Sequence, residues 1–389
     1  MKKRRDILQT FDNKDLENLK AVLDKGDLCS VRGGMTPKFE KTFAEKIGAE
    51  YAVAMNSGMS ALHAAVAAAD AGPGDEVICD PMVQFGAMAV FYNNAVPVFA
   101  DIDPGTYLID PRSIEQRITD RTKAIICTHL WGLPCDMEEI MDIARAHQIT
   151  VIEDCAHALL AQYKSRFTGT LGHIGVFSFQ MSKQLGLGDA GMATTADPFL
   201  YERLLDGSGV RGLATFPRLM WNYRLNELVS AVGLAQLEKV EYYVEEHIER
   251  ARIYNETLAN IGCLHVQICP PDRTHSYHLW AACLDTEEIG WNHMGLERLL
   301  AEKGVLARIG YIGKPAYLHD VFRGPLAYGK GCPLSCPYYS SPVRYQPGLC
   351  PEAEKIMPNM LLVPLKWNSR EDHRDNAEKL KICLKAFSE

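Results

Sequence analysis

The 389-residue sequence has no long apolar run and no excess of basic residues. No segment approaches the roughly 18 consecutive apolar residues that a membrane-spanning helix requires. Residues 1–5 are basic, but residues 6–19 alternate charged and apolar side chains and lack the apolar run of a signal peptide. The formal net charge of -8 provides no long-range attraction to nucleic acid or to an anionic membrane. We therefore expect a cytoplasmic protein that binds neither nucleic acid nor membranes.

The sequence also lacks regularly spaced cysteine pairs, although it contains 12 cysteines. In a long chain without a signal sequence, reduced thiols are expected rather than disulfides. The tightest cluster joins Cys332 and Cys336, with Cys350 nearby, and it has neither a second spaced pair nor paired histidines. We expect no metal site.

The distribution of apolar residues predicts an α/β fold in two domains, because the chain exceeds the length that one core usually serves. Between residues 50 and 195, short apolar runs alternate with helical patterns, which is typical of a mainly parallel sheet between helices. Ligands bind such sheets at the carboxyl ends of the strands. Residues 226–261 predict one long helix that joins a large domain, residues 1–250, to a smaller α/β domain, residues 251–389. Residues 324–358 predict a long ordered loop near the site.

The first motif that indicates chemistry lies where an apolar strand runs through Asn56-Ser57-Gly58 into an alanine-rich helix. A helix N-terminus offers unpaired N–H groups and the positive end of a dipole, and a glycine there lets a phosphate approach the backbone. The motif predicts a phosphate-binding turn. The alternative is a plain N-cap, in which the Ser57 hydroxyl satisfies the first turn of the helix.

Two further motifs bring ionisable side chains to the same edge of the sheet. The apolar strand that starts at Val151 ends in Asp154, and His157 follows three residues later. Lys183 lies in a loop of polar residues and glycines between two short apolar strands. A desolvated lysine amine can attack a carbonyl, and a carboxylate facing a pyridine nitrogen keeps that nitrogen protonated, so the set suits pyridoxal 5′-phosphate (PLP). Taken singly, the three have common alternatives: a helix cap, a structural histidine and a surface lysine.

Together these motifs resemble those of the DegT/DnrJ/EryC1/StrS family of sugar aminotransferases. The resemblance runs from about Gly33 to Gln236 and becomes loose in the last third of the chain. It rests on several motifs in the family's order: FEKTFAEKIGAEYAVAMNSG, GDEVICDP, VIEDCAHA, GVFSFQMSK and WNYRLNELVSAVGLAQL.

The resemblance implies the PLP-dependent transferase fold type I, with Lys183 carrying PLP as a Schiff base and acting as the base in proton transfer. It also implies that Asp154 pairs with the pyridine nitrogen, that His157 contacts the phenolic oxygen of the ring, and that Phe85 stacks on the ring. The alternative for Phe85 is a core phenylalanine.

The resemblance further implies a phosphate site that is shared between two subunits. In one subunit the phosphate ligands are Ser57, Gly58, Met59 and Ser178. Asn222 of the partner subunit completes the set, so the family predicts a homodimer with shared active sites. The alternative for Asn222 is a cap for the helix that follows it.

Several positions depart from the family pattern. Met59 and Gln84 stand where threonines are usual, so a hydroxyl contact to the phosphate is missing at Met59 unless Ser57 or Ser60 replaces it. Gly188-Asp-Ala-Gly191 replaces a Glu-Gly-Gly pattern. Gln180 resembles the cyclitol branch of the family more than the nucleotide-sugar enzymes.

The expected reaction is transamination from glutamate or glutamine to a keto sugar, either linked to a nucleotide or a free keto cyclitol. Two alternatives remain open. One is the dehydratase branch of the family, which has a histidine where this chain has Lys183. The other is a regulatory protein without catalysis on the same fold.

Overall fold

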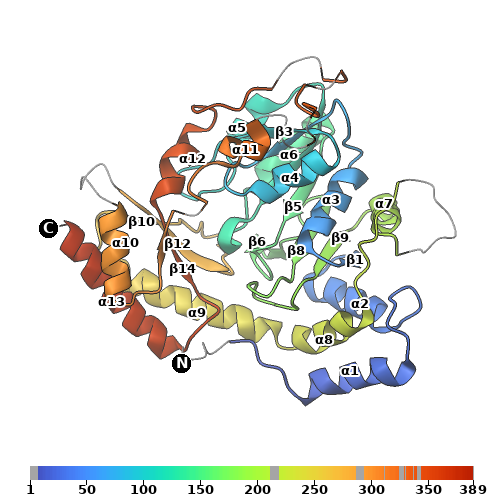
Figure 1. The fold of residues 1–389 in the computed structure, drawn as a ribbon, viewed down its shortest axis with the longest axis horizontal. Helices are drawn as coiled ribbons and strands as arrows, with labels where there is room; N and C mark the ends of the chain where they lie inside the picture. Colours follow the sequence, from blue (N-terminus) through green and yellow to red (C-terminus); the bar gives the residue numbers. More distant parts are fainter. Residues whose placement is uncertain are drawn as a thin grey trace.

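The computed structural model describes residues 8–210, 219–285, 293–310, 312–323, 328, 330–335, 337–339 and 343–388. Within them lie a seven-stranded sheet, a four-stranded sheet and a three-stranded sheet, surrounded by helices (Figure 1). The three-stranded sheet consists of the two-residue strands β6 (Gln162–Tyr163), β7 (Arg166–Phe167) and β11 (Arg273–Thr274).

The central seven-stranded sheet has the order β1-β9-β8-β5-β4-β2-β3. Its strands are β1 (Tyr51–Met55), β2 (Glu76–Cys79), β3 (Val96–Phe99), β4 (Thr122–Thr128), β5 (Thr150–Asp154), β8 (Ile174–Ser178) and β9 (Gly191–Thr195). From β3 to β8 all neighbours are parallel, whereas β9 is antiparallel to both β8 and β1. The predicted mainly parallel α/β sheet is confirmed, as are the two short strands that flank Lys183.

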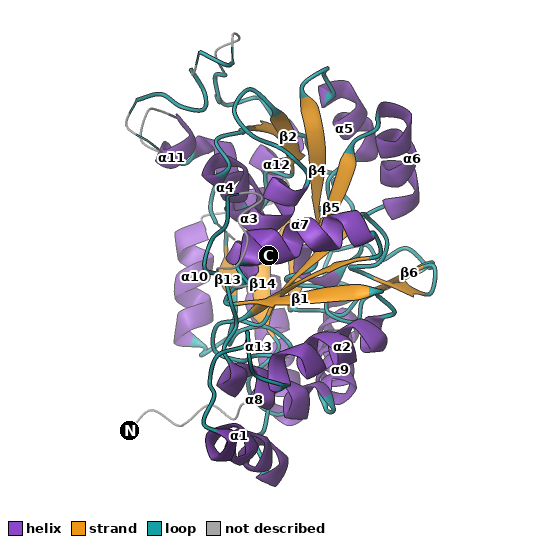
Figure 2. Ribbon diagram, turned by 90° about the vertical axis from the view of Figure 1, so that its right-hand side faces the viewer, coloured by secondary structure: helices purple, strands orange, loops and turns teal. Residues whose placement is uncertain are grey.

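Helices cover both faces of this sheet, which explains why its strands are almost continuously apolar. Figure 2 shows α3 and α4 on one side of the strands and α5 and α6 on the other. The helices up to β9 and the one after it are α1 (Asn13–Lys25), α2 (Met35–Ile47), α3 (Gly58–Ala68), α4 (Gln84–Tyr92), α5 (Pro111–Arg117), α6 (Met137–His147) and α7 (Pro198–Ser208), with a 3-10 turn η1 (Leu130–Gly132). The core of the sheet is therefore enclosed, and its carboxyl edge is where side chains can meet a ligand.

The single long helix predicted over residues 226–261 is wrong, because two helices occupy this stretch. They are α8 (Glu227–Leu237) and α9 (Val240–Leu258). The helices follow different partners, since α8 packs against α1 and α2 while α9 packs against α13 (Arg370–Ser388). Helical periodicity persists across the break, so the pattern alone did not reveal it.

The C-terminal region forms a four-stranded antiparallel sheet with the order β10-β12-β14-β13. Its elements are β10 (Leu264–Val266), β12 (Leu279–Leu284), α10 (His293–Glu302), β13 (Arg308–Ile309), β14 (Met360–Pro364) and α13. The predicted domain boundary at residue 250 falls inside α9 and stays a prediction. Tyr317 and Phe322 nevertheless pack into the core of the large sheet, so part of the predicted small domain covers the large one.

The predicted loop of residues 324–358 lies partly outside the described residues, and so does Cys336 of the cysteine cluster. Where it is described, its end is helical. The elements before and within it are η2 (Ala316–Leu318), α11 (Asp320–Arg323), α12 (Pro351–Ile356) and η3 (Met357–Asn359). No helix in the described part of the chain is both long and apolar enough to span a bilayer.

Candidate active site

A cavity of about 420 Å³ opens at the carboxyl edge of the central sheet. It gathers side chains from strand ends, helix starts and loops that are far apart in sequence. Eight of the nine predicted site residues line it: Ser57, Gly58, Met59, Phe85, Asp154, His157, Ser178 and Lys183. The ninth, Asn222, does not.

The turn after β1 forms one wall of the cavity. Ser57 caps α3, because its Oγ accepts the N–H of Ser60 at 3.0 Å and lies 2.8 Å from the Ser60 hydroxyl. The Ser60 hydroxyl in turn donates to Asn56 at 2.6 Å. The N-cap alternative for Ser57 is therefore realised, while the N–H groups of Gly58 and Met59 begin the helix without intrahelical partners.

Gly58 leaves the space that such a turn needs. A Cβ atom at this position would lie 2.7 Å from the Cβ and 3.0 Å from the Oγ of Ser178. Real side chains do not pack so closely, so any residue larger than glycine would push Ser178 aside. The main chain of α3 and the Ser178 hydroxyl can therefore approach the same small anion.

Asp154 ends β5 and is 3% exposed. Its Oδ1 accepts the N–H of Ala156 at 3.0 Å. Burial raises the pKa of Asp154, and the N–H of Ala156 and the charge of Lys183 oppose that rise. A buried carboxylate with so few donors fits a cationic ligand group, because an added positive charge would restore its ionised form.

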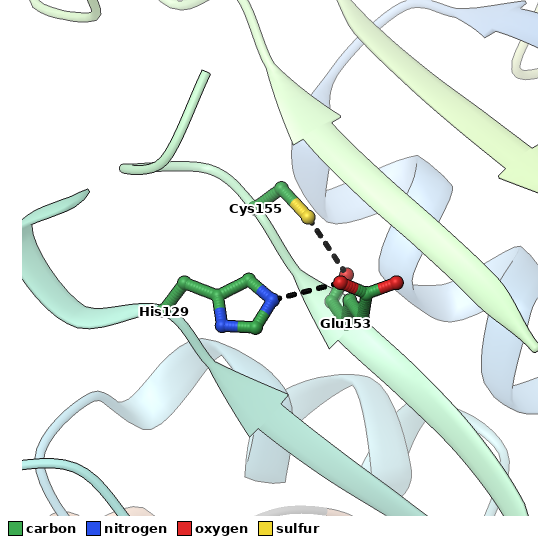
Figure 3. Close-up of side chains that lie close together, drawn as sticks. All are labelled: His129, Glu153 and Cys155. Atoms are coloured by element: carbon green, nitrogen blue, oxygen red, sulfur yellow. Dashed lines mark hydrogen bonds and ion pairs between the residues drawn. The ribbon is translucent and has the colours of Figure 1, made fainter. Parts of the chain in front are cut away.

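Glu153 precedes Asp154, and the alternation of strand β5 sends the two side chains to opposite faces. Its carboxylate accepts three backbone N–H groups, from Gly169 at 2.9 Å, Leu171 at 2.8 Å and Gly172 at 2.7 Å. Figure 3 shows the fourth contact, from His129 at 2.9 Å. Because His129 Nδ1 accepts the N–H of Cys135, its proton lies on Nε2 and is donated to Glu153.

The side chains of His129, Glu153 and Cys155 lie close enough together for a metal ion. Their hydrogen bonds describe a different arrangement. Both Glu153 oxygens are occupied by donors, and the Cys155 thiol faces the Glu153 main-chain oxygen at 3.8 Å (Figure 3). Burial also raises the pKa of the Cys155 thiol well above its usual range, which disfavours the thiolate that a metal would need. These hydrogen bonds fix the end of β5 on the face opposite to the Asp154 side chain.

His157 is 8% exposed, and its ring stacks on that of His278, with centroids 4.5 Å apart and an angle of 14° between the planes. Burial lowers the pKa of both imidazoles well below the usual range, so both are neutral. His157 Nδ1 accepts the N–H of Trp131 at 3.4 Å, which leaves its proton on Nε2.

His278 is a cavity residue that the sequence reasoning missed. It precedes β12, and its own N–H donates to the Trp131 carbonyl at 2.6 Å, which fixes its ring beside His157. Its Nδ1 atom is buried and has no hydrogen-bond partner among the described residues. A histidine directly before an apolar strand was the available signal, but strand position alone does not reveal that β12 begins at the cavity.

Lys183 lies in the loop between β8 and β9, where its N–H donates to the Gln180 carbonyl at 2.8 Å. Burial lowers the pKa of its amine to about 8, against the opposing pull of Asp154. The neutral form that a nucleophilic amine needs is therefore much more populated near physiological pH than in an ordinary lysine. This property separates it from an ordinary surface lysine.

The ring of Phe85 is 50% exposed on the first turn of α4 and faces the cavity. The alternative of a core phenylalanine is therefore wrong. An exposed aromatic ring beside a cavity suits stacking on a flat ligand.

Asn222 is exposed and does not line the cavity. It lies next to Asn56, at the turn between β1 and α3 of its own chain. Its carbonyl lies 3.4 Å from Asn56 Nδ2, and the neighbouring Tyr223 carbonyl accepts the Asn56 N–H at 2.8 Å. The cap of the following helix is Asn226, whose side chain accepts the N–H of Val229. The helix-cap alternative for Asn222 is therefore wrong.

Four of the positions that depart from the family pattern border the cavity: Met59, Gln180, Asp189 and Ala190. Gln180 is exposed, and its Oε1 accepts both the N–H and the hydroxyl of Ser182. Gln84 does not line the cavity.

Comparison with known proteins places these residues in a family. Residues 9–341 match the DegT/DnrJ/EryC1/StrS aminotransferase family. The GDP-perosamine synthase of Escherichia coli O157:H7 is 37% identical over 286 residues, which cover 72% of this chain and 77% of that protein. The putative L-glutamine:3-amino-2,3-dideoxy-scyllo-inosose aminotransferase of Micromonospora echinospora is 34% identical over 257 residues, which cover 64% of this chain and 62% of that protein.

Among solved structures, the aminotransferase from Psychrobacter cryohalolentis has a TM-score of 0.84 and 27% sequence identity, and the match covers 99% of this chain and 100% of that one. The family match spans most of the chain and extends well beyond residue 236, where the resemblance of separate motifs had weakened. The chain belongs to the DegT/DnrJ/EryC1/StrS aminotransferase family, and it is an enzyme of the sugar aminotransferase type.

Proposed function

We propose that this enzyme transfers an amino group from glutamate or glutamine to a keto sugar, with PLP bound covalently by Lys183. The observation that carries this proposal is the convergence of a lysine of lowered pKa, a buried carboxylate, a neutral histidine and a helix N-terminus in one cavity. PLP, when bound, supplies an electron sink that stabilises negative charge on the substrate carbon.

The residues present fit this cofactor. The N–H groups of Gly58 and Met59 and the hydroxyl of Ser178 would hold the phosphate, and Ser57 would support the turn as its cap. The Asp154 carboxylate would keep the ring nitrogen protonated. The Nε2 proton of His157 is available to donate to the phenolic oxygen, and the face of Phe85 would cover the ring.

Lys183 would have a second task as the base of the amino transfer. Its amine, with a pKa of about 8, would take a proton from the α-carbon of the amino donor. It would later deliver a proton to the acceptor carbon that receives the amino group. The stacked rings of His157 and His278 line the same cavity as this amine. The retained lysine also argues against the dehydratase branch.

The choice of acceptor is between a nucleotide-linked keto sugar and a free keto cyclitol. The Escherichia coli relative carries GDP-perosamine in its name, whereas the Micromonospora echinospora relative names L-glutamine as donor and an inosose as acceptor. Gln180 at the cavity favours the cyclitol only by resemblance.

A panel assay separates these acceptors. The loaded enzyme is given ¹⁵N-labelled glutamate or glutamine and, in turn, nucleotide-linked keto sugars and free keto cyclitols, and the products are analysed by mass spectrometry. We expect one acceptor class to gain the label. An enzyme that binds PLP but labels no keto ring would contradict the proposal and favour the regulatory alternative.

Borohydride reduction provides an independent check of the cofactor's attachment point. The reduced protein is digested and the pyridoxyl-labelled peptide is sequenced. We expect the label on Lys183. A label on any other lysine would refute the assignment.

We also propose a homodimer in which Asn222 reaches the phosphate bound by the partner subunit. Its exposed side chain beside the turn at Asn56 supports this, as does its absence from the cavity of its own chain. A two-fold interface lets one residue from each chain complete the other's site.

Mixing two inactive variants tests the shared site. When Lys183→Ala and Asn222→Ala subunits are combined, heterodimers with shared sites have both defects in one site and an intact second site, so activity returns. If heterodimers form and remain inactive, the role of Asn222 across the interface is disproved.

A further inference from the structure

A second lysine, Lys366, lies buried behind the loop that carries Lys183. It follows strand β14 in the C-terminal sheet and is 3% exposed. Its Nζ atom donates to the main-chain carbonyls of Met181 at 2.6 Å and of Lys183 at 2.5 Å. The segment that follows the C-terminal sheet thus contacts the backbone of Lys183 directly.

The third partner of Lys366 is Gln9, whose Oε1 lies 3.2 Å from Nζ. An ammonium group has three N–H donors, so these three oxygens satisfy it completely. No carboxylate of the described residues lies within ion-pair distance of Nζ, and burial lowers its pKa to about 8. A buried ammonium group is costly unless it is hydrogen-bonded, and here neutral oxygens provide all of its hydrogen bonds. Loss of any one of the three contacts would therefore leave a buried N–H group without a partner.

Gln9 holds the other end of the same loop. Its carboxamide accepts the N–H of Gly186 at 3.0 Å and donates to the Gly186 carbonyl at 2.7 Å. The backbone beside it is also tied down, since the Leu8 N–H donates to the Lys366 carbonyl at 3.1 Å. The loop from Met181 to Gly186 is therefore fixed by two residues that lie near opposite ends of the chain.

The packing leaves no spare room at this junction. A Cβ atom on Gly186 would lie 2.7 Å from Lys366 Nζ and 2.8 Å from the Met181 carbonyl oxygen. Gly186 has no positive φ, so an alanine there would be resisted by this contact and not by its backbone conformation. The position of the Lys366 ammonium group therefore requires a residue without a Cβ atom at position 186.

We propose that Lys366, together with Gln9, is a positioning residue for Lys183: its ammonium group holds the 181–186 main chain so that the Lys183 amine faces the cavity shared with Asp154. This inference rests on the proposed function of Lys183. The ordinary alternative is that Lys366 only ties the C-terminal sheet to the large one. That alternative predicts a loss of overall stability without a specific change in the loop.

Hydrogen–deuterium exchange of the cofactor-free protein separates the two. We compare wild type with Lys366→Met in peptides covering residues 178–190 and in reference peptides from β4 and β5. Exchange reports local opening as well as global unfolding. We expect exchange in the loop peptides to rise at least about tenfold, with the reference peptides within about twofold of wild type.

Two further variants complete the design. Gly186→Ala disturbs the same contact from the loop side and should raise exchange in the same peptides, which keeps the test open if Lys366→Met fails to fold. Lys46→Met is the matched control, because Lys46 also joins two distant segments, α2 and α9, through its ion pair with Glu241, without touching the loop or Gln9. It should leave exchange in the loop unchanged.

The loaded protein gives the second measurement. If Lys366 positions Lys183, Lys366→Met should shift the pH midpoint of the bound cofactor's visible absorbance, and Lys366→Arg should restore part of the shift. Wild-type exchange in the loop of both Lys366→Met and Gly186→Ala would overturn the inference, as would an equal rise in all peptides. Failure of the proposed function would appear elsewhere, as a borohydride label on another lysine.

Discussion

The two sides of the cavity are built in different ways. In the turn at Asn56–Ser60 the hydroxyl hydrogen bonds join residues within four positions of one another, and only Asn56 has distant partners, the carbonyls of Asn222 and Tyr223. The loop at Met181–Gly186 depends on Gln9 and Lys366, which lie 177 and 183 or more positions away. The cap at the start of α3 is therefore largely local, whereas the loop of the reactive lysine is held by residues near the two ends of the chain.

This difference has a functional logic. Phosphate binding needs only fixed N–H groups at a helix start, which local geometry supplies. A reactive amine must in addition be desolvated and oriented, and burial by distant parts of the chain does both. We therefore expect changes in the loop at Met181–Gly186, the loop side, to abolish amino transfer. Changes in the turn at Asn56–Ser60, the turn side, should weaken cofactor affinity.

The largest effect should come from Lys183→Ala. Without the amine, covalent attachment is lost and no base remains beside the substrate carbon, so we expect amino transfer to fall at least about 10³-fold. Steady-state rates at saturating PLP measure the loss. Lys164→Ala, at an exposed lysine, is the control and should behave as wild type. A Lys183 variant with more than a tenth of normal activity would contradict the comparison.

Asp154→Asn should come next, because this residue lies between the two sides. The near-isosteric amide cannot hold a cationic ring nitrogen, so we expect the single-turnover rate with the amino donor to fall about 10²-fold. Cofactor affinity should change less than the rate, since the turn at Gly58 is untouched. Thermal unfolding checks that the variant is folded. Wild-type rates would mean that another acid pairs with the ring.

The pH dependence of cofactor attachment tests the loop side from another direction. Only the neutral amine attacks, and the pKa of Lys183 is lowered to about 8, so the rate should be constant above pH 8. Below that value the rate should fall about tenfold per pH unit, because protonation follows the Henderson relation. Stopped-flow absorbance from pH 6 to 9 measures it. A midpoint near the ordinary lysine value would show that Lys183 is not desolvated.

Gly58→Ala should affect affinity on the turn side. Its Cβ would fall 2.7 Å from that of Ser178, so the turn or the strand end must move. We expect PLP binding to weaken about tenfold or more, equivalent to about 1.4 kcal/mol. Gly72→Ala is the control, because a Cβ there meets no atom within 4 Å. Equal affinities of the two variants would refute the phosphate turn.

The smallest effect should follow Met59→Thr, which restores the hydroxyl usual in the family. One added neutral hydrogen bond contributes about 0.5–1.5 kcal/mol, so PLP affinity should rise about two- to tenfold. Equilibrium titration of the cofactor-free protein measures it. An unchanged affinity would indicate that Ser57 or Ser60 already supplies the missing contact.

Patterns within short windows predicted much of the fold and the site. Alternating strands and helices predicted the parallel sheet, and strand ends predicted that Ser57, Asp154 and Lys183 would meet at one edge. The single helix over residues 226–261 failed because helical periodicity continues through the break at Glu238 and Lys239. Side-chain bonds from Lys239 to Thr10 and Asp15 lie at that break, and no local pattern encodes them.

The sequence by itself determined the turn from β1 into α3, the Ser57 cap of that helix and the position of Asp154 at the end of β5. Each of these features depends on residues that are neighbours in the chain. Only the tertiary structure decided which face each carboxylate of the Glu153–Asp154 pair serves, that His278 stacks on His157, and that Lys366 supports Lys183. These outcomes depend on burial and on contacts between residues that are 16 or more positions apart in the case of Glu153 and more than a hundred apart in the case of His278 and Lys366. Such contacts carry no periodic signal, since the chain must fold before the partners meet.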